Sequence, residues 1–517
     1  MISILNNIIG PVMRGPSSSH SAAGLRIGRI ARDLMNNNIE KIVVEYDPEG
    51  ALQNTHLSQG TDMGLYSGIL GYHADDKQLI DYKYLIEKSG IEITVAYNPL
   101  EIKHPNTYKL TLQNSKEQHQ LIALSTGGGM IEVILIDNEK ISFTGDCYII
   151  LVFIHGAVNK EDLISFIKSN YFEVKNQNDR FIAIVSFEKP NDHFLNCIGK
   201  IQSVDYVRVI SPVLPVLAAK EIHIPFHSLP EMNQYNMNKN LALWQLALRY
   251  ESACGNISEN RVFEMMENIV EILSNSIEEG KRGTKYEDRI LHDQSVNFGK
   301  MEAAGKLLGE GLHNKIIHYV SLLMEVKSSM GVIVAAPTAG SCGVLPGSVF
   351  ATAQYLGVSK SEIVKAMLTA GLIGLFVAAK STFSAEVAGC MAECGAASGM
   401  AAAALCQLGN GTIDQCLASA SFALQNSMGM ICDPIAARVE APCIGKNVMS
   451  ALNALACSNM ALAGYNHLIP LDEVIEAFDK VGRSLPRELR CTALGGLSVS
   501  PTAKEIEMNL LKLKTKS

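Results

Sequence analysis

The feature that most constrains the fold is a change in hydrophobic pattern near Ile222. Upstream of it, β-branched runs alternate or stay apolar between turn residues, which is the pattern of strands. Downstream, apolar residues recur at helical spacing in a composition rich in Ala and Gly, as in "NVMSALNALACSNMALAGY". The sequence therefore predicts an α+β multidomain protein whose C-terminal part is all helical.

We predict three domains within this frame. The strand-like runs of residues 1–146 indicate an N-terminal α+β domain with a largely antiparallel sheet. Residues 147–221 have the order βαββαβ, which is typical of a small ferredoxin-like module. Residues 222–517 form the all-helical domain. A chain of 517 residues is long enough for about two to four domains with substantial cores.

Charge and cysteine content limit which partners and which cellular compartment we expect for the protein. The formal charge of −8 and the pI near 5.9 offer no basic face for a nucleic acid. The N-terminus has no basic stretch before its short apolar run, so we expect no secretory leader. With 12 cysteines and no leader, we expect a cytoplasmic protein whose thiols are free, buried or metal-bound.

Two uncharged runs raise the question of a membrane span. The run 331–359 is long enough but contains Pro337 and Pro346, and the more apolar run 366–379 is too short to cross a bilayer. We interpret both as packed interior and expect no membrane partner.

A serine-rich segment precedes the first amphipathic helix. It contains Ser17, Ser18, Ser19, His20 and Ser21. A helix start presents free backbone N–H groups, and hydroxyls add donors, so the segment suits a carboxylate or a phosphate. The alternative is a helix cap with more hydroxyls than capping needs.

Further polar clusters lie between the structured runs. "STGGGM" at 125–130 is a Gly-rich turn, which is either an anion-binding nest or a tight hairpin. "HPNTY" at 104–108 and "QGTDMG" at 59–64 each favour a turn when taken alone. "AAPTAGSCGVLPG" at 335–347 predicts a non-helical loop that lines a cavity within the helical domain.

Three cysteines stand out among the thiols of the helical domain. Cys432 and Cys443 flank a stretch stiffened by Pro434 and Pro442, and Cys390 lies in "SAEVAGCMAECG". A structural zinc site takes four ligands, commonly with paired spacing that is absent here. An iron–sulfur cluster held by three cysteines leaves one iron open as a Lewis acid. Three other cysteines in Ala-rich helices read as packing residues: Cys406, Cys416 and Cys457.

Taken together, these motifs resemble those of bacterial iron–sulfur L-serine dehydratases (L-serine ammonia-lyases). The resemblance rests on "GPSSSHS", "HPNTY", "STGGG", "APTAGSCGVLPG", "AEVAGC", "CDP…APCIGKN" and "CTALGGLSVSPT", which occur in family order over nearly the whole chain. It implies that a β region, a small ACT-type regulatory module and an α region are fused in one polypeptide. It also implies a [4Fe–4S] cluster held by Cys390, Cys432 and Cys443.

By this resemblance the activity is removal of water from L-serine, which gives pyruvate and ammonia, in a homodimer or a higher homo-oligomer. The catalytic candidates are His20, His56, Gln59 and Asp62. The substrate-binding candidates are Ser17, Ser18, Ser19, Ser21, Thr61, His104, Asn106, Ser125, Thr126 and Gly127. We also expect the Ser17–His20 loop to meet the cluster across a domain interface.

The chain departs from the family pattern at several points. The family usually has G-H-G-T-D where this chain reads "SQGTD", and Gln59 cannot act as a base at neutral pH, whereas His56 lies three residues earlier. Cys394 is an extra thiol about one helical turn after Cys390. The module has "IHGAVNKED" where effector-binding members carry a more acidic Pro-Gly loop, and the C-terminus lacks the cysteine tail of some relatives.

These departures leave alternatives open. One is a related β-eliminating lyase that acts on cysteine or another 3-substituted alanine. Another is a catalytically impaired homologue that binds an amino acid without turning it over. A pyridoxal-phosphate lyase would need a Schiff-base lysine in a recognisable setting, and the sequence shows none.

Overall fold

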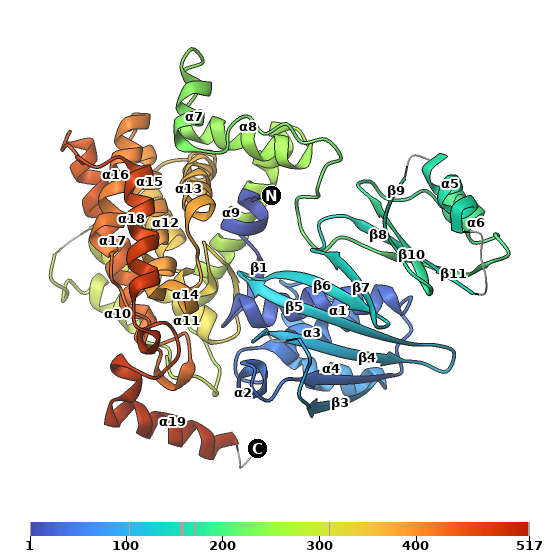
Figure 1. Cartoon of the computed structure of the whole chain (residues 1–517). Coiled ribbons are helices and arrows are strands. Elements are labelled where there is room, and N and C mark those ends of the chain that lie inside the picture. Colours follow the sequence, from blue (N-terminus) through green and yellow to red (C-terminus); the bar gives the residue numbers. More distant parts are fainter. Residues whose placement is uncertain (1, 103, 156–159, 170–171, 310, 515–517) are drawn as a thin grey trace. The chain divides into compact units, whose positions relative to one another are not determined.

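The computed structural model describes residues 2–102, 104–155, 160–169, 172–309 and 311–514. The chain folds into two compact units (Figure 1). The sheet unit is Ser19–Glu221, and the helical unit combines Met1–Ser18 with Ile222–Ser517. The N-terminal residues of the predicted 1–146 domain therefore pack in the helical unit. The division at 146 and 221 into three domains stays a prediction.

The sheet unit contains a six-stranded sheet with the order β3-β2-β4-β5-β6-β7. Its strands are β2 (Lys41–Tyr46), β3 (Glu92–Tyr97), β4 (Thr107–Gln113), β5 (Gln118–Gly127), β6 (Met130–Ile136) and β7 (Glu139–Phe143). All neighbouring pairs are antiparallel except β2 with β3, where Tyr46 lies opposite Tyr97. This confirms the largely antiparallel sheet that the sequence predicts.

Helices α1 (Ala23–Leu34) and α3 (Thr61–Leu70) pack backbone to backbone in this unit. Glycines make the approach possible. A Cβ at Gly28 would lie 2.2 Å from the carbonyl oxygen of Leu65, and a Cβ at Gly64 would lie 2.0 Å from that of Ser21. The close crossing brings the end of the serine-rich segment against the first turn of α3. The unit also contains the short helices α2 (Leu52–Thr55) and α4 (Tyr82–Ser89).

A second, four-stranded sheet of the unit has the order β11-β8-β10-β9. Its elements follow one another as β8 (Tyr148–Ile154), α5 (Lys160–Ser169), β9 (Glu173–Gln177), β10 (Phe181–Ser186), α6 (Asp192–Ile198) and β11 (Val204–Ile210). This confirms the predicted βαββαβ order. Its identification as an ACT-type module stays a prediction, and most of the loop compared with effector-binding members, residues 156–159, lies outside the described residues.

The helical unit is built mainly from long helices. They are α7 (Leu229–Asn236), α8 (Leu243–Gly255), α9 (Glu259–Lys281), α10 (Ser295–Ala303), α11 (Leu312–Ser328), α12 (Val344–Leu356), α13 (Lys360–Lys380), α14 (Ala385–Cys390), α15 (Ala396–Leu408), α16 (Ile413–Ser427), α17 (Cys443–Leu462), α18 (Leu471–Ser484) and α19 (Pro501–Lys514). The predicted helical pattern downstream of Ile222 is thus confirmed in the described residues, but the prediction of an all-helical domain is wrong at Val332–Val334, which form strand β12 because they pair with the N-terminal segment.

The N-terminal segment is tied into this helical unit. Strand β1 (Val12–Arg14) pairs antiparallel with β12 (Val332–Val334). The fully buried carboxylate of Glu251 accepts hydrogen bonds from the Ile4 amide at 2.7 Å and the Leu5 amide at 3.0 Å. These bonds satisfy amides of the first turn of the segment, which have no partner within that turn.

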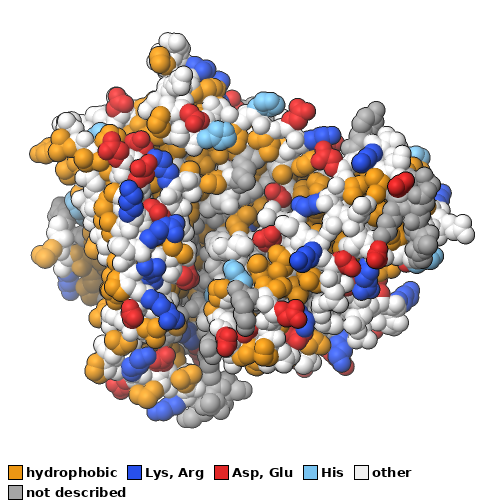
Figure 2. Space-filling model, viewed as in Figure 1, with side chains coloured by type: hydrophobic (Ala, Val, Ile, Leu, Met, Phe, Trp, Pro, Cys, Tyr) orange, Lys and Arg blue, Asp and Glu red, His pale blue; other side chains and the backbone are white. Residues whose placement is uncertain are grey.

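Two stretches of the helical unit are long and apolar enough to pass for membrane spans, namely Lys360–Lys380 and Ala385–Leu408. Their most apolar windows are 72% and 94% buried among other parts of the protein. The first stretch contains the run 366–379, and its burial fits the interpretation of that run as packed interior. On the face drawn in Figure 2, the described Lys and Arg side chains are interspersed with Asp and Glu.

Candidate functional site

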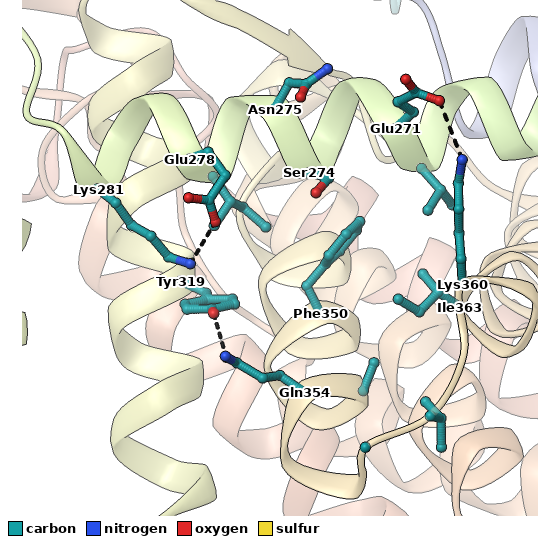
Figure 3. A pocket seen from close by; sticks show the side chains of 15 residues that line it. Glu271, Ser274, Asn275, Glu278, Lys281, Tyr319, Phe350, Gln354, Lys360 and Ile363 are labelled. Atoms are coloured by element: carbon teal, nitrogen blue, oxygen red, sulfur yellow. Dashed lines mark hydrogen bonds and ion pairs between the residues drawn. The ribbon is translucent and has the colours of Figure 1, made fainter.

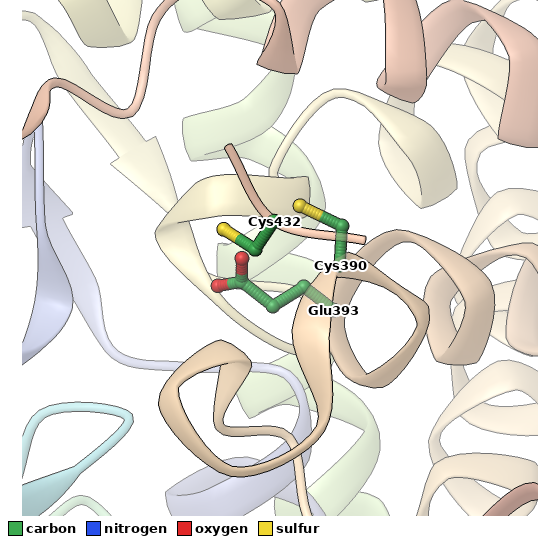
Figure 4. Close-up of side chains that lie close together, drawn as sticks. All are labelled: Cys390, Glu393 and Cys432. Atoms are coloured by element: carbon green, nitrogen blue, oxygen red, sulfur yellow. The ribbon is translucent and has the colours of Figure 1, made fainter. Parts of the chain in front are cut away.

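Two of the predicted cluster cysteines lie together in the helical unit. The Sγ atoms of Cys390 and Cys432 and a carboxylate oxygen of Glu393 all lie within 4.8 Å of one another. Figure 4 shows the three side chains directed toward a common space. Both cysteines are buried. Two thiols and a carboxylate at this spacing are donors that a soft metal centre can use.

A break in the helix at Gly389 places Cys390. Gly389 has φ 69° and ψ −173°, and a Cβ there would lie 2.9 Å from the carbonyl oxygen of Met430. Glycine is therefore required both by its backbone conformation and by the close approach. The Met391 amide donates to that same Met430 carbonyl at 2.9 Å, which joins the Cys390 segment to the chain entering Cys432.

The C-terminal segment holds Cys432 from the other side and brings in a further thiol. The Cys432 amide donates to the Leu489 carbonyl at 2.8 Å, and the Cys491 amide donates to the Cys432 carbonyl at 3.2 Å. Hydrogen bonding to the Cys390 and Cys491 thiols, together with burial, raises the pKa of Cys432. The sequence analysis missed Cys491, although the residue lies inside the quoted motif "CTALGGLSVSPT".

Lys446 provides a cation at the edge of this cysteine group. Its Nζ donates to Asp433 Oδ1 at 2.5 Å and to the Ile431 carbonyl at 2.7 Å, and lies 3.9 Å from Cys390 Sγ. Burial opposes its charge, but Cys390 and the Asp433 carboxylate outweigh burial and raise the pKa of Lys446. Lys446 follows Cys443 within the "PCIGKN" motif, and that motif could have identified it from the sequence.

The third predicted ligand, Cys443, begins α17 and is buried. Asn447, one turn further, donates to the Cys443 carbonyl at 2.9 Å and to Cys394 Sγ at 3.5 Å. Burial, and then the neighbouring Cys390, raise the pKa of both Cys394 and Cys443. The charge of Cys390 thus acts on Cys443. The Cys443 Sγ is not among the ligand atoms that lie within 4.8 Å of one another.

The raised thiol pKa values show that the protein alone does not favour the thiolate form of these cysteines. Without a cation, these buried thiols are held in their protonated form. A bound metal reverses this preference because it favours thiolates. The group of sulfur donors therefore fits a metal centre, whereas the predicted packing cysteines lie buried elsewhere on α15, α16 and α17.

The predicted loop at 335–347 borders this cysteine group, but it is shorter than expected. Helix α12 begins at Val344, and Pro346 is tolerated because amides of a first turn need no partner within the helix. Thr338 Oγ1 donates to Glu393 Oε1 at 2.7 Å, and a Cβ at Gly340 would lie 2.7 Å from that oxygen. Burial raises the pKa of Glu393 to about 7.

A buried lysine, Lys327, was also missed by the sequence analysis. It lies within a buried stretch at the end of α11, and its Nζ donates to the Val439 carbonyl. After the effect of burial and of Cys390, its positive charge lowers the pKa of Cys443. A lysine in an amphipathic helix carries no local signal that it points inward.

In the sheet unit, several predicted substrate-binding residues are joined by hydrogen bonds. Ser125 Oγ donates to the Ser19 carbonyl at 2.7 Å, and the Ser125 amide donates to the Asn106 carbonyl at 3.0 Å. The serine-rich segment forms a turn at 18–22, and the N-cap position of α1 is Ala22, which makes no side-chain cap bond. Ala22 itself has helical φ and ψ, because the turn at 18–22 runs directly into α1.

Other predicted residues of this unit have local roles or buried oxygens. "STGGGM" is the β5–β6 hairpin, with φ of 108° at Gly127. The His104 carbonyl accepts a hydrogen bond from Thr107 within a turn. "QGTDMG" is a turn only up to Gly60, since α3 begins at Thr61. Within the described residues, Asn106 Oδ1 is buried without a hydrogen-bond partner in the protein, and Thr61 lies beside the buried Tyr108 hydroxyl.

His56 and Asp62, two of the predicted catalytic residues, form a buried pair. His56 Nδ1 lies 2.9 Å from both carboxylate oxygens of Asp62, and His56 Nε2 lies 2.8 Å from the Tyr97 hydroxyl. Gln59 is buried in the turn between them. Tyr97 was missed by the sequence analysis, because it ends a strand far along the chain and belongs to no motif.

His20 contacts Thr55, the residue before His56. Its Nε2 lies 2.9 Å from Thr55 Oγ1, whose own proton goes to the Ala51 carbonyl at 2.6 Å. Thr55 therefore accepts, and Nε2 of His20 carries the ring proton. Burial lowers the pKa of His20 to about 4, so the imidazole is neutral at physiological pH.

This lowered pKa predicts a pH-dependent stability. Between pH 6.5 and about 4, the unfolded state takes up a proton at His20 and the folded state does not, so the free energy of unfolding falls as pH falls. A His20→Gln variant keeps a donor for Thr55 and should lose this part of the acid sensitivity. Denaturant midpoints of both proteins at pH 7.5 and 5 measure it, with His73→Gln as the exposed control. Equal acid sensitivity of His20→Gln and the parent protein would contradict the prediction.

A separate cavity of about 610 Å³ lies among α9, α11, α12 and α13 (Figure 3). Lys360 forms an ion pair with Glu271 at one place on its wall, and Lys281 pairs with Glu278 at another. The Tyr319 hydroxyl donates to Gln354. The charged groups of this wall are already paired with one another, and none of the cysteines lines the cavity.

Comparison with known proteins gives a consistent result. The family described as "Serine dehydratase alpha chain" matches residues 238–498. The chain is 33% identical over 285 residues to "Probable L-serine dehydratase, alpha chain" of Bacillus subtilis (strain 168), which covers 55% of this chain and 95% of that protein. It is 32% identical over 215 residues to "Probable L-serine dehydratase, beta chain" of the same organism, covering 40% and 96%. It is 25% identical over 496 residues to "L-serine dehydratase" of Helicobacter pylori (strain J99 / ATCC 700824), covering 94% and 96%.

Proposed function

The chain belongs to the L-serine dehydratase family, with the counterparts of an alpha and a beta chain in one polypeptide, and on this basis we propose that it removes water from L-serine. The elimination gives aminoacrylate, which hydrolyses to pyruvate and ammonia. One structural observation carries the proposal beyond family membership. The convergent thiols of Cys390 and Cys432 lie inside the part of the chain that matches the family.

We further propose that Cys390, Cys432 and Cys443 hold a [4Fe–4S] cluster. The burial of the three sulfur donors and the raised pKa values of the Cys432 and Cys443 thiols support a centre that favours thiolates. When bound, a cluster with three cysteine ligands supplies an electrophilic iron that assists departure of the serine hydroxyl. Lys446 and Lys327 add positive charge around the thiolates.

The chain's own residues bind and orient the substrate in this proposal. We assign carboxylate binding to the serine-rich segment, which holds Ser17, Ser18, Ser19 and Ser21. We assign further polar contacts with the substrate to Thr61, His104, Asn106, Ser125, Thr126 and Gly127. The hydrogen bonds of Ser125 and the buried Oδ1 of Asn106 support this assignment. It stays a prediction that the serine-rich segment and the cysteines act in one site.

Proton transfer requires a positioned base, because the serine α-proton is weakly acidic. The candidates are His20, His56 and Asp62, whereas Gln59 can only donate and accept hydrogen bonds. The neutral His20 keeps an unprotonated imidazole nitrogen at neutral pH, and His56 Nδ1 is hydrogen-bonded to Asp62. Gln59 is therefore assigned a hydrogen-bonding role.

The test is purification without oxygen, followed by counts of iron and acid-labile sulfide and an assay of pyruvate released from L-serine. We expect about four irons and four sulfides per chain, and pyruvate formation that disappears after exposure to air. An iron-free protein that forms pyruvate would contradict the cluster. An iron-loaded protein that forms pyruvate from cysteine but not from serine would contradict the substrate.

Three further expectations complete the proposal. We propose that the chain forms a homodimer or a higher homo-oligomer, that it works in the cytoplasm, and that residues 147–221 are an ACT-type module. Light scattering of the full chain tests the first. Changes in the serine saturation curve on adding free amino acids test whether the module is regulatory.

A further inference from the structure

A row of three hydrogen-bonded side chains leads from the interior of the sheet unit to its surface. We call Asp62, His56 and Tyr97 the relay. Asp62 lies in the first turn of α3, His56 follows α2, and Tyr97 is the last residue of β3. Asp62 and His56 are 4% and 5% exposed, whereas Tyr97 is 46% exposed. Only the tyrosine end of the relay meets solvent.

The hydrogen bonds define the proton arrangement in which the relay can act. An ionised carboxylate only accepts, so His56 Nδ1 donates to Asp62 at 2.9 Å. In the tautomer with its proton on Nδ1, His56 accepts the Tyr97 hydroxyl proton at Nε2, across 2.8 Å. Burial and the nearby Asp62 charge raise the pKa of Tyr97, so this hydroxyl keeps its proton at rest.

The surroundings of the relay are aromatic. The Tyr46 ring lies 5.2 Å from the His56 ring, and Tyr46 in turn contacts Tyr108 edge-on. A carboxylate and an imidazole are costly to place in such a setting, and apolar side chains of similar size would pack there without that cost. A purely structural pair would also need no hydroxyl at the surface. The arrangement instead matches a base that acts through a hydroxyl, with a carboxylate that orients the imidazole.

We propose that Tyr97 is a catalytic residue of the dehydration and that His56 and Asp62 are its positioning residues. This inference rests on the proposed function. Tyr97 gives its proton to His56 Nε2 while its oxygen takes the serine α-proton. The electron pair of the broken C–H bond forms the C=C bond, and the β-hydroxyl leaves as hydroxide with its own pair. Tyr97 then gives a proton to the hydroxide, which becomes water, and regains one from His56 Nε2, which restores the relay.

The relay is also adjacent to the serine-rich segment. Thr55, which precedes His56, accepts the hydrogen bond from His20 Nε2 at 2.9 Å. Thr55, the residue before His56, thus contacts the segment assigned to carboxylate binding. At the end of α2, Thr55 links the position of His56 to that of His20 in the serine-rich segment.

The test compares Tyr97→Phe with the parent protein, both as the full chain loaded with iron and sulfide without oxygen. The variant removes one oxygen from a partly exposed ring, and Tyr84→Phe, on a 61% exposed tyrosine of α4, is the matched control. We expect kcat for pyruvate formation to fall about 10²–10⁴-fold with KM for serine little changed. With α-deuterated serine, the isotope effect on kcat should rise, because proton removal becomes rate-limiting.

Each other outcome overturns the inference. Unchanged kcat in Tyr97→Phe would show that the hydroxyl transfers no proton. A higher KM with unchanged kcat would assign Tyr97 to binding, and a lower kcat with an unchanged isotope effect would assign it to another step. Equal iron and sulfide in all three proteins keeps cluster loss from imitating any of these results. If the parent protein itself releases no pyruvate, the proposed function fails, which is a different result from an active Tyr97→Phe.

Discussion

Replacing Cys432 by Ser is expected to abolish iron retention and serine turnover together. The Cys432 thiol is buried beside Cys390 and Cys491, and its hydrogen bonds to these thiols, together with burial, raise its pKa. A serine hydroxyl ionises far less readily than a thiol and is a poor ligand for a soft iron centre. We expect turnover to fall at least about 10³-fold, which corresponds to roughly 4 kcal/mol of barrier.

The measurement is iron per chain, acid-labile sulfide and pyruvate release, all on protein kept free of oxygen. Cys457→Ser is the matched control, because Cys457 is equally buried on α17 and a hydroxyl can keep its hydrogen bond from Asn426. Cys390→Ser and Cys443→Ser should behave like Cys432→Ser. A Cys432→Ser protein with full iron and normal turnover would refute the ligand assignment.

Replacing Lys446 by Met is expected to destabilise the helical unit strongly, even in iron-free protein. The side chains of Lys446 and Asp433 are 16% and 4% exposed, and their ion pair spans 2.5 Å. Removing the ammonium leaves the buried Asp433 carboxylate without its cation. Breaking a buried pair in this way typically costs about 3–5 kcal/mol. Met keeps most of the volume of the lysine stem, so a cavity contributes little.

The change in the denaturant midpoint of the iron-free protein measures this effect. Lys380→Met is the control, because Lys380 pairs with Glu476 at the surface, where the side chains are 33% and 54% exposed, and such pairs are worth about 0–1 kcal/mol. The Asp433 carboxylate also accepts the Leu497 amide at 2.9 Å, so we expect the C-terminal segment to loosen as well. Equal midpoints for the two variants would show that the buried pair is not needed for stability.

The sequence alone was sufficient for the elements that depend on local pattern. β-branched alternation predicted the sheets upstream of Ile222, and helical spacing predicted the helices downstream of it. The βαββαβ order of the second sheet was readable for the same reason, since each strand or helix is specified by the spacing of its own apolar residues. The amphipathic helix after the serine-rich segment was equally local.

The extent of individual loops was less readable. "QGTDMG" and the end of the 335–347 loop were predicted to be non-helical, yet α3 begins at Thr61 and α12 at Val344. At Thr61 the reason is tertiary, because packing against α1 through glycines makes the first turn of α3 favourable. Local propensity is weak enough for such packing to decide the boundary.

Only the tertiary structure decided which side chains meet. The resemblance of their motifs singled out Cys390 and Cys432, but their shared place depends on a glycine kink and on a C-terminal segment that also delivers Cys491. Tyr97 reaches His56 because β3 lies beside β2, a pairing that no motif near Tyr97 announces. The pattern of apolar residues determines which face of an element is buried, and therefore the elements themselves. Contacts between residues distant in the chain depend on how those faces pack, and that information is spread over the whole sequence.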